Sequence, residues 1–246
     1  MAVSLPELPE PYGAALSEAC RQALDAFDAR ALLIGGTILR GEGHATSDFD
    51  LVLIHGASWR QRVQYWAYGV PVELFVNPDR ALRAAMQHEV RIGRQVMIHL
   101  FRTGVIVLDP EGIAAALRAE AEALFAAGPQ LPPPTIEQRQ YQVACLLDDT
   151  CDIREVDADR SRSLLNQALD GAAELHFLRS GRWQPRSKVL YEALAQDDPD
   201  AGAELRAVLH SWSGADLTER ARTLVEHLAG VRGFFAWASK PEEVPT

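Results

Sequence analysis

The chain has 246 residues, enough for one large domain or two domains of ordinary size. Apolar residues make up 48% of it and charged residues 24%, as in soluble globular proteins. The net charge of −10 divides into −4 for residues 1–130, with 11 Arg against 15 acidic residues, and −6 for the rest, with 13 basic against 19 acidic residues. Neither part has the basic excess that binding to a nucleic acid backbone requires, so nucleic acid is not an expected partner.

The three cysteines, Cys20, Cys145 and Cys151, form no CxxC pair and no metal-ligand spacing, which favours free thiols in a reducing compartment. The first residues, MAVSLPELPEPYG, lack the basic and apolar segments of a signal peptide. No apolar run approaches the roughly 18 residues that a membrane span needs. We therefore expect a cytoplasmic protein without a membrane partner, and the sequence leaves open whether it is a homodimer.

The first elements follow from the spacing of apolar residues. A helix is predicted over Gly13–Arg30, where apolar residues recur at helical spacing. Buried strands are predicted at Ala31–Ile34 and Phe49–Ile54, separated by a Gly-Gly-Thr turn and a polar loop. The aromatic-rich segment Arg60–Tyr68 is expected to be helical or irregular.

A third strand is predicted at Val70–Val76, and Pro71 confines its beginning to an edge or a position without a ladder bond. The rest of this half is predicted to contain one or two helices within 78–103 broken near Gly93, a strand at Val105–Asp109, and a helix from Gly112 to about Ala126.

Residues 128–135, GPQLPPPT, hold four prolines and a glycine, which no helix or sheet interior tolerates. After them only helical periodicity remains. Gly181 is expected at a helix C-terminus and Pro185 in the first turn of the next helix. The predicted helices lie near 137–156, 164–178, 185–195, 201–213 and 216–229. We therefore predict an α/β domain with a small mixed sheet (1–127), a proline-rich linker (128–135) and an all-α helical bundle (136–246).

Two carboxylates begin the strand at Phe49–Ile54. Because a strand alternates its side chains, Asp48 and Asp50 point one way, while Phe49, Leu51 and Leu53 point into the layer behind. Carboxylates at the head of a buried strand need compensation. Mg²⁺ takes oxygen ligands and commonly binds one or two carboxylates together with substrate phosphates, so a magnesium site is the natural compensation.

The turn GGTILRGEG fits neither of two common phosphate-binding motifs. A Walker A loop needs Lys and Ser/Thr after its second glycine, but Gly41 is followed by Glu42-Gly43, and the G-x-G-x-x-G spacing of a Rossmann turn is absent. What remains is a turn that presents backbone N–H groups and the Thr37 hydroxyl to phosphate, ahead of a helix N-terminus. Taken alone, the glycines would favour an ordinary strand-to-helix turn; the Asp-Phe-Asp strand twelve residues later favours the site.

Together, Gly36-Thr37, Arg40-Gly41 and Ser47-Asp48-Phe49-Asp50 resemble the signature of the nucleotidyltransferase superfamily of the DNA polymerase β type, which includes the aminoglycoside nucleotidyltransferases and their minimal bacterial relatives. Thr37 replaces the usual Ser and keeps the hydroxyl. The resemblance is specific over residues 31 to 77. It implies that Asp48 and Asp50 are catalytic metal ligands and that the nucleotide is bound by Gly35, Gly36, Thr37, Arg40, Ser47 and Lys188.

The third acid is expected on a neighbouring strand. Glu73 is the one charge inside the apolar run Val70–Val76 and matches the family's third acid, while a solvated edge-strand glutamate is the alternative. The resemblance implies two Mg²⁺ ions, ATP or another nucleoside triphosphate, and transfer of AMP to a small hydroxylated acceptor of the aminoglycoside-like kind. Glu73 shares a metal or accepts the acceptor's proton.

The second half offers fewer candidates. Lys188, one of two lysines in the chain, opens a helical segment similar to one that contacts the triphosphate in several aminoglycoside nucleotidyltransferases. Asp148 and Asp149 could supply the general base, although such clusters are more often solvated. Two other hypotheses stay open: a protein adenylyltransferase of the antitoxin-like branch, and a regulatory protein that binds nucleotide without turnover.

Overall fold

The computed structural model describes residues 5–211, 214 and 216–238. It divides into two compact units. One consists of Met1–Val90 and Gln95–Ala127, and the other of Arg91–Arg94 and Gly128–Thr246. Among the helices in the described part of the chain, none is long and apolar enough to cross a membrane.

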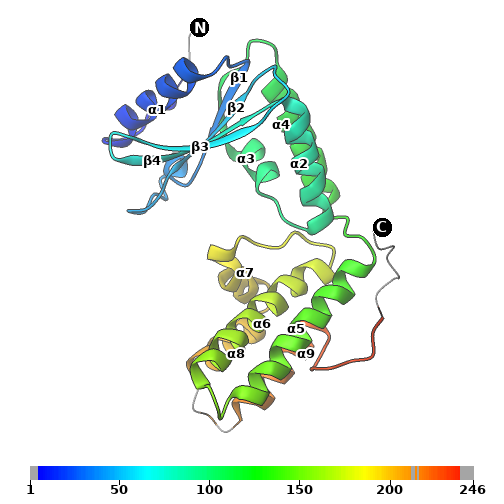
Figure 1. The fold of residues 1–246 in the computed structure, drawn as a ribbon. Helices are drawn as coiled ribbons and strands as arrows, with labels where there is room; N and C mark the ends of the chain where they lie inside the picture. Colours follow the sequence, from blue (N-terminus) through cyan, green and yellow to red (C-terminus); the bar gives the residue numbers. More distant parts are fainter. Residues whose placement is uncertain (1–4, 212–213, 215, 239–246) are drawn as a thin grey trace, which may run out of the picture. The chain divides into compact units, whose positions relative to one another are not determined.

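A mixed sheet forms the centre of the first unit (Figure 1). Its strands are β1 (Ala31–Gly35), β2 (Phe49–Ile54), β3 (Gln61–Ala67), β4 (Val70–Asn77) and β5 (Val105–Leu108). They lie in the order β3-β4-β2-β1-β5. The β2–β4 pair is parallel and the other three pairs are antiparallel. The predicted small mixed sheet is therefore confirmed.

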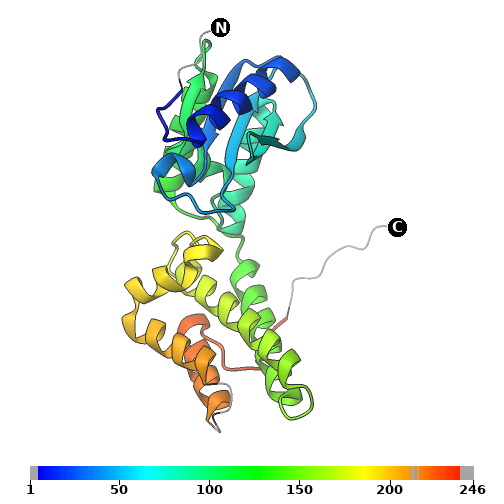
Figure 2. The same cartoon turned by 90° about the vertical axis from the view of Figure 1, so that its left-hand side faces the viewer.

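Helix α1 (Tyr12–Ala26) covers one face of this sheet (Figure 2). It packs on β3 and β4, and the core beneath it contains Phe49, Leu51 and Leu53 of β2, as strand alternation predicts. The helix is shorter than predicted, because Phe27 has extended backbone, with φ −135° and ψ 143°.

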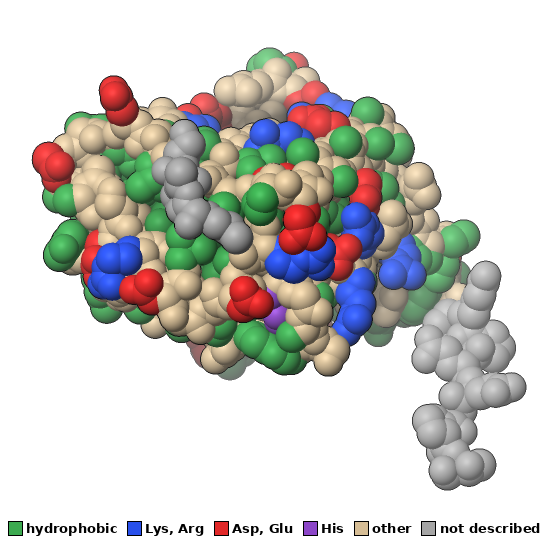
Figure 3. Space-filling view, turned by 90° about the horizontal axis from the view of Figure 1, so that it is seen from above, with side chains coloured by type: hydrophobic (Ala, Val, Ile, Leu, Met, Phe, Trp, Pro, Cys, Tyr) green, Lys and Arg blue, Asp and Glu red, His purple; other side chains and the backbone are tan. Residues whose placement is uncertain are grey.

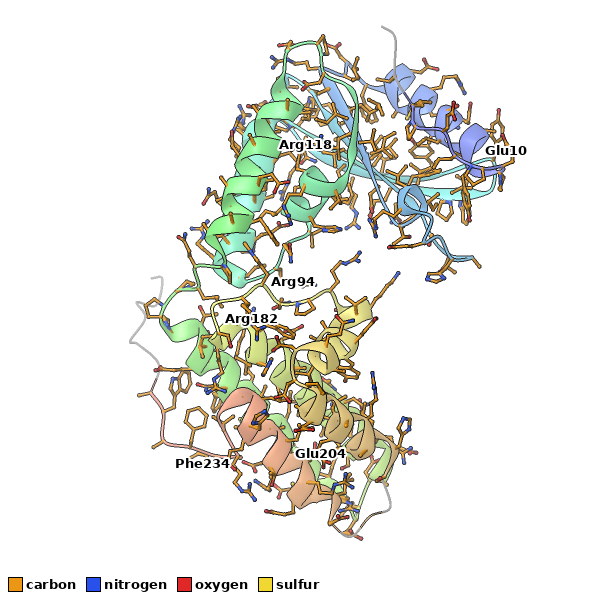
Figure 4. All side chains as sticks on the ribbon, turned by 180° about the vertical axis from the view of Figure 1, so that it is seen from behind. Glu10, Arg94, Arg118, Arg182, Glu204 and Phe234 are labelled. Atoms are coloured by element: carbon orange, nitrogen blue, oxygen red, sulfur yellow. The ribbon has the colours of Figure 1, made fainter. Side chains whose placement is uncertain are left out.

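The opposite face of the sheet is covered by helices that follow β4 and β5. These are α2 (Asp79–Ile92), α3 (Met97–Thr103) and α4 (Ile113–Ala127). The predicted break near Gly93 is confirmed, and this glycine has φ +75°. Arg118 of α4 donates to the carbonyl oxygens of Phe101 at 2.9 Å and Gly104 at 2.6 Å (Figure 4). These bonds hold α4 against the end of α3.

The structure corrects the prediction for Arg60–Tyr68, which forms strand β3 rather than a helical or irregular segment. Val63 and Tyr65 pack toward α1, and the Tyr65 hydroxyl donates to the carbonyl oxygen of Ala19 at 2.7 Å. A tight turn at Tyr68-Gly69, with φ +44° and +81°, joins β3 to β4. Alternate side chains of this segment therefore point to opposite faces of the sheet. The sequence does not show this alternation clearly, because polar and aromatic residues are mixed on both faces.

Strand β4 is an inner strand, so the expectation that Pro71 marks a sheet edge is wrong. Pro71 lies opposite Trp66 of β3, and the pairing of β4 with β2 begins one residue later, at Val72 opposite Phe49. The other predicted alternative, a position without a ladder bond, is correct with respect to β2, because Pro71 has no register partner on that strand. The missing N–H of proline therefore costs no bond to β2.

The second unit is helical, and among its described residues no strand occurs. Its helices are α5 (Pro134–Ile153), α6 (Ala158–Arg179), α7 (Leu190–Asp197), α8 (Pro199–His210) and α9 (Leu217–Ala229), with a one-turn 3₁₀ helix at Ser187–Val189. Their shared core includes Leu147, Leu169, Leu205 and Leu228. Residues 212 and 213 of the helix predicted at 201–213 lie outside the described residues.

Two predictions about helix ends in this unit have different outcomes. Gly181, with φ +69°, follows α6 as predicted; its N–H donates to Leu178 and that of Arg182 donates to Phe177, which closes the helix. Pro185 does not open the next helix, since α7 begins at Leu190. Instead Pro134 occupies the first turn of α5, although the sequence places it in the linker.

The C-terminal aromatic residues lie along the helical unit. Phe235 packs against its core, and the Trp237 ring stacks on Tyr141 with centroids 5.1 Å apart. The side chain of Phe234 is 90% exposed and points away from the helices (Figure 4). Phe235 and Trp237 therefore attach the C-terminal segment to the helical unit, and Phe234 does not.

Charged side chains of both signs are interspersed on the face of the molecule drawn in Figure 3. Several form ion pairs along the helices. Arg21 of α1 pairs with Glu18 and Asp25, at 2.6 and 2.7 Å. Such exposed pairs contribute little to stability. They do account for the acidic residues on the helix surface, whereas the carboxylates clustered on the sheet need a different explanation.

Candidate active site

Three carboxylates converge on the sheet face opposite α1. Asp48, Asp50 and Glu73 each offer an oxygen, and these oxygens lie within 4.8 Å of one another. Asp50 of β2 is the register partner of Glu73 on β4, and Asp48 lies two residues earlier on the same face as Asp50. We call these three residues the acidic triad. Their convergence follows from strand alternation combined with the parallel β2–β4 pairing.

Asp50 is the most perturbed member of the acidic triad. Burial, together with the smaller effect of the charges of Asp48 and Glu73, raises the pKa of its carboxyl to about 6. Arg62 and Arg40 act in the opposite direction. A partly buried group of like charges is electrostatically unfavourable, and a bound cation would relieve it.

Glu73 has a cationic partner that the sequence did not reveal. Arg62 of β3 forms an ion pair with its carboxylate, and the Gln64 amide donates to the same oxygen at 3.4 Å. The Arg62 guanidinium also lies over the Phe75 ring, 5.2 Å from its centroid. Only 12% of the Glu73 side chain is exposed, so the alternative of a solvated edge glutamate is wrong. Reading QRVQYWA as a strand would have placed Arg62 and Gln64 on the face of Glu73.

The two glycines of the turn allow the backbone to approach the acidic triad closely. Gly36 has φ +111°, and a Cβ on it would lie 2.8 Å from the carbonyl oxygen of Asp48. Gly35 pairs with Asp50, and a Cβ there would lie 2.4 Å from a methyl carbon of Leu100 on α3. Gly36 therefore excludes a side chain, whereas a side chain at Gly35 would require the Leu100 side chain to move.

Hydroxyl groups connect the two ends of the loop between β1 and β2. Thr37 Oγ1 donates to Ser47 Oγ at 3.1 Å, and the same oxygen accepts the N–H of His44 at 2.8 Å. Arg40 donates to the carbonyl oxygen of Gly36 at 3.3 Å and pairs with Glu42 at 3.0 Å. These bonds hold Thr37, Ser47 and Arg40 near Asp48.

The turn continues into Ile38–Arg40, which is a single turn of 3₁₀ helix. A helix dipole needs aligned peptides over several turns, so this segment contributes none of the N-terminal helix field expected from the sequence. The polar groups that the turn offers are its backbone N–H groups and the Thr37 hydroxyl.

The candidates from the helical unit differ in their surroundings. Lys188 is exposed in the 3₁₀ helix Ser187–Val189, and its contact with a triphosphate stays a prediction. Asp148 is engaged at both oxygens: one accepts from Arg222 at 2.9 Å and the other from the N–H of Phe234 at 2.7 Å. Asp149 is exposed. The contacts of Asp148 give it a structural role in attaching the C-terminal segment.

Other acidic residues of the first unit cap helices or pair with arginine. Glu89 is buried and accepts the N–H groups of Met97 and Ile98 at 2.7 and 3.0 Å, which caps α3. Asp109 accepts those of Ala114 and Ala115 at the start of α4. These contacts explain the two carboxylates without a metal.

Comparisons with known proteins support the fold. No family model matches the chain, and no curated protein matches it. The crystal structure of a nucleotidyltransferase-like protein from Exiguobacterium sibiricum superposes with a TM-score of 0.52, over 88% of this chain and 73% of that one, at 16% identity. The chain therefore has a nucleotidyltransferase-like fold. At this identity the activity has to be argued from the site.

Proposed function

We propose that the protein is a metal-dependent nucleotidyltransferase that moves AMP from ATP to a hydroxyl of a small acceptor, of the aminoglycoside-like kind. The observation that carries the proposal is the acidic triad, whose oxygens lie within 4.8 Å of one another beside the Gly36-Thr37 turn. The nucleotidyltransferase-like fold supports it.

The residues of the triad fit magnesium. Every donor is a carboxylate oxygen, the ligand type that Mg²⁺ prefers, and the raised pKa of Asp50 reflects its burial together with the neighbouring charges of Asp48 and Glu73. Asp48, Asp50 and Glu73 would hold the metal. Two bound ions would stabilise the attacking and leaving oxygens of an in-line displacement.

The remaining chemistry belongs to the chain. The Gly36-Thr37 backbone and the Thr37 hydroxyl bind the phosphates, with Arg40, Ser47 and Lys188 as further contacts. A bond forms between the acceptor oxygen and the α-phosphorus, and the bond from that phosphorus to pyrophosphate breaks. Pyrophosphate leaves with the electron pair, and Glu73 accepts the proton of the acceptor hydroxyl. We assign this base to Glu73 because its contacts with Arg62 and Gln64 reach the same single oxygen, whereas both oxygens of Asp148 accept hydrogen bonds, from Arg222 and from the N–H of Phe234.

Two measurements test the proposal. Incubation with ATP, Mg²⁺ and a set of hydroxylated compounds should give, by mass spectrometry, one product heavier by one adenylyl group. In calorimetry, binding of the ATP analogue AMPCPP should require Mg²⁺ and be lost in Asp50→Asn. Asp25→Asn, a change at an exposed acid of α1, is the matched control and should bind normally. Nucleotide binding that ignores both metal and Asp50→Asn would leave the protein as an inert binder, and adenylylation of a protein substrate alone would favour the antitoxin-like alternative.

A further inference from the structure

A small pocket adjoins the acidic triad on its β3 side. It has a volume of about 210 Å³, and its lining includes Asp48, Glu73, Gln64, Trp66 and Pro71. Two of its lining residues are therefore members of the triad, and the others come from the β3–β4 hairpin. Its size suits one six-membered ring rather than a whole nucleotide.

The register of the hairpin aligns these side chains. Gln64 lies opposite Glu73 and Trp66 opposite Pro71, so all four share one face of the sheet. The indole of Trp66 is 68% exposed, and no hydrogen bond or ring contact to it occurs within residues 5–211, 214 and 216–238. A large flat apolar surface that is left in water beside carboxylates and an amide is suited to a ligand with one apolar face and polar edges.

The order of strands places this pocket on the side of the triad away from the Gly36-Thr37 turn. From β1 to β3 the sheet presents Gly35, Asp50, Glu73 and Gln64 as successive register partners. The Gly36-Thr37 turn thus lies on one side of the triad and Trp66 on the other. The backbone of Trp66 on β3 is two strands away from that of β2, a distance of about 10 Å. In an in-line displacement the leaving pyrophosphate and the attacking oxygen lie on opposite sides of the phosphorus. If the turn holds the leaving phosphates, the acceptor approaches from Trp66.

We propose that this pocket is the acceptor subsite and that Trp66 is its specificity-determining residue. This inference rests on the proposed function. The acceptor is a hydroxylated saturated ring, such as a sugar or cyclitol, whose C–H face stacks on the indole and whose hydroxyls hydrogen-bond to the Gln64 amide. One ring hydroxyl then points between Asp48 and Glu73, where the transferred phosphorus would lie.

The test compares the wild-type protein with Trp66→Ala, Trp66→Phe and Tyr68→Asn. Tyr68 is the matched control, since it is an exposed aromatic of the same hairpin outside the pocket, and asparagine tolerates its positive φ. Calorimetry measures the affinity of Mg²⁺–AMPCPP first. The titrants in its presence are myo-inositol, methyl glucoside and kanamycin as ring probes and sorbitol as an open-chain polyol.

A ring probe should bind the wild type better than sorbitol does, and Trp66→Ala should weaken that binding about tenfold, the loss typical of an aromatic anchor at a contact. Trp66→Phe should retain most of the affinity and Tyr68→Asn all of it. The affinity for Mg²⁺–AMPCPP should change less than about twofold in all three variants.

Three results would overturn the assignment. The first is that no ring probe binds the wild-type protein. The second is that Trp66→Ala binds a ring probe as tightly as the wild-type protein does. The third is a weakened affinity of Trp66→Ala for Mg²⁺–AMPCPP, which would make the indole a nucleobase contact. Failure of the proposed function has a different signature, because Mg²⁺–AMPCPP would then fail to bind the wild-type protein itself.

Discussion

Arg62 on the edge strand β3 forms an ion pair with Glu73 on the inner strand β4. The side chain of Arg62 is 63% exposed, whereas that of Glu73 is 12% exposed. The pair compensates one of three clustered carboxylates, and a cation bound to the triad would compete with Arg62 for the same oxygens. The metal-free protein therefore contains its own counter-charge at the candidate metal site.

Removal of this counter-charge should strengthen metal binding. Arg62→Ala is expected to lower the free energy of unfolding of the metal-free protein by up to about 1 kcal/mol, the range of partly exposed pairs, and to raise the affinity for Mg²⁺ several-fold. Calorimetry with Mg²⁺ and thermal unfolding with and without the metal measure both effects. Arg60→Ala, at an exposed residue just before β3, is the control. Weaker Mg²⁺ binding by Arg62→Ala would show that Arg62 does not compete with the metal.

Mg²⁺ binding should weaken as the pH falls through about 6. The pKa of Asp50 is raised to about 6, chiefly by burial, so protons compete with metal for this carboxylate at a pH where an ordinary aspartate is fully charged. Because the folded pKa lies above the ordinary 3.8, the folded metal-free protein binds more protons than the unfolded chain, and its stability should decrease as the pH rises from about 4 to about 6. Calorimetry with Mg²⁺ between pH 5 and 8 tests the binding prediction. An affinity for Mg²⁺ that stayed constant below pH 7 would contradict it.

Gly36→Ala should damage the site through both strain and collision. At φ +111° a side chain is unfavourable, and its Cβ would lie 2.8 Å from the Asp48 carbonyl oxygen. We expect a loss of about 1–3 kcal/mol in unfolding free energy and weaker Mg²⁺–AMPCPP binding. Gly41→Ala separates the two effects, because Gly41 has φ +74° with open space around it. It should cost about 1 kcal/mol and leave nucleotide binding intact; equal binding losses in both variants would argue against the collision.

Glu89→Ala should reduce stability without altering the chemistry. The buried carboxylate accepts two N–H groups at the start of α3, and its removal leaves them unsatisfied, at a cost of about 2–3 kcal/mol. Glu89→Gln keeps one acceptor and should cost less. Urea unfolding measures the difference, and the product formed per folded molecule should match the wild type. A selective loss of turnover in a fully folded Glu89→Gln protein would instead indicate a functional carboxylate.

Asp148→Asn should loosen the C-terminal segment rather than remove a base. The variant weakens the bonds to Arg222 and to the N–H of Phe234, so we expect a loss of about 1–2 kcal/mol in unfolding free energy with turnover unchanged. Asp149→Asn, at an exposed neighbour, should change neither property. Loss of turnover at unchanged stability in Asp148→Asn would restore the helical unit as the source of the base.

Much of the site could be predicted because it depends on local rules. Strand alternation alone places Asp48 and Asp50 on one face and Phe49 on the other, and the structure agrees. The single charge in an apolar run marks Glu73, and Gly36 signals a close backbone approach. Each of these inferences needs only residues a few positions apart.

The tertiary structure decided the rest, because it depends on which distant segments pair and in what register. The partnership of Asp50 with Glu73 requires the parallel β2–β4 register, and the contact of Arg62 with Glu73 requires β3 to be a strand. Asp148 is held by residues 74 and 86 positions away, which no local pattern indicates. Side-chain period is a property of one segment, whereas the neighbour of a side chain is set by free energies summed over the whole fold.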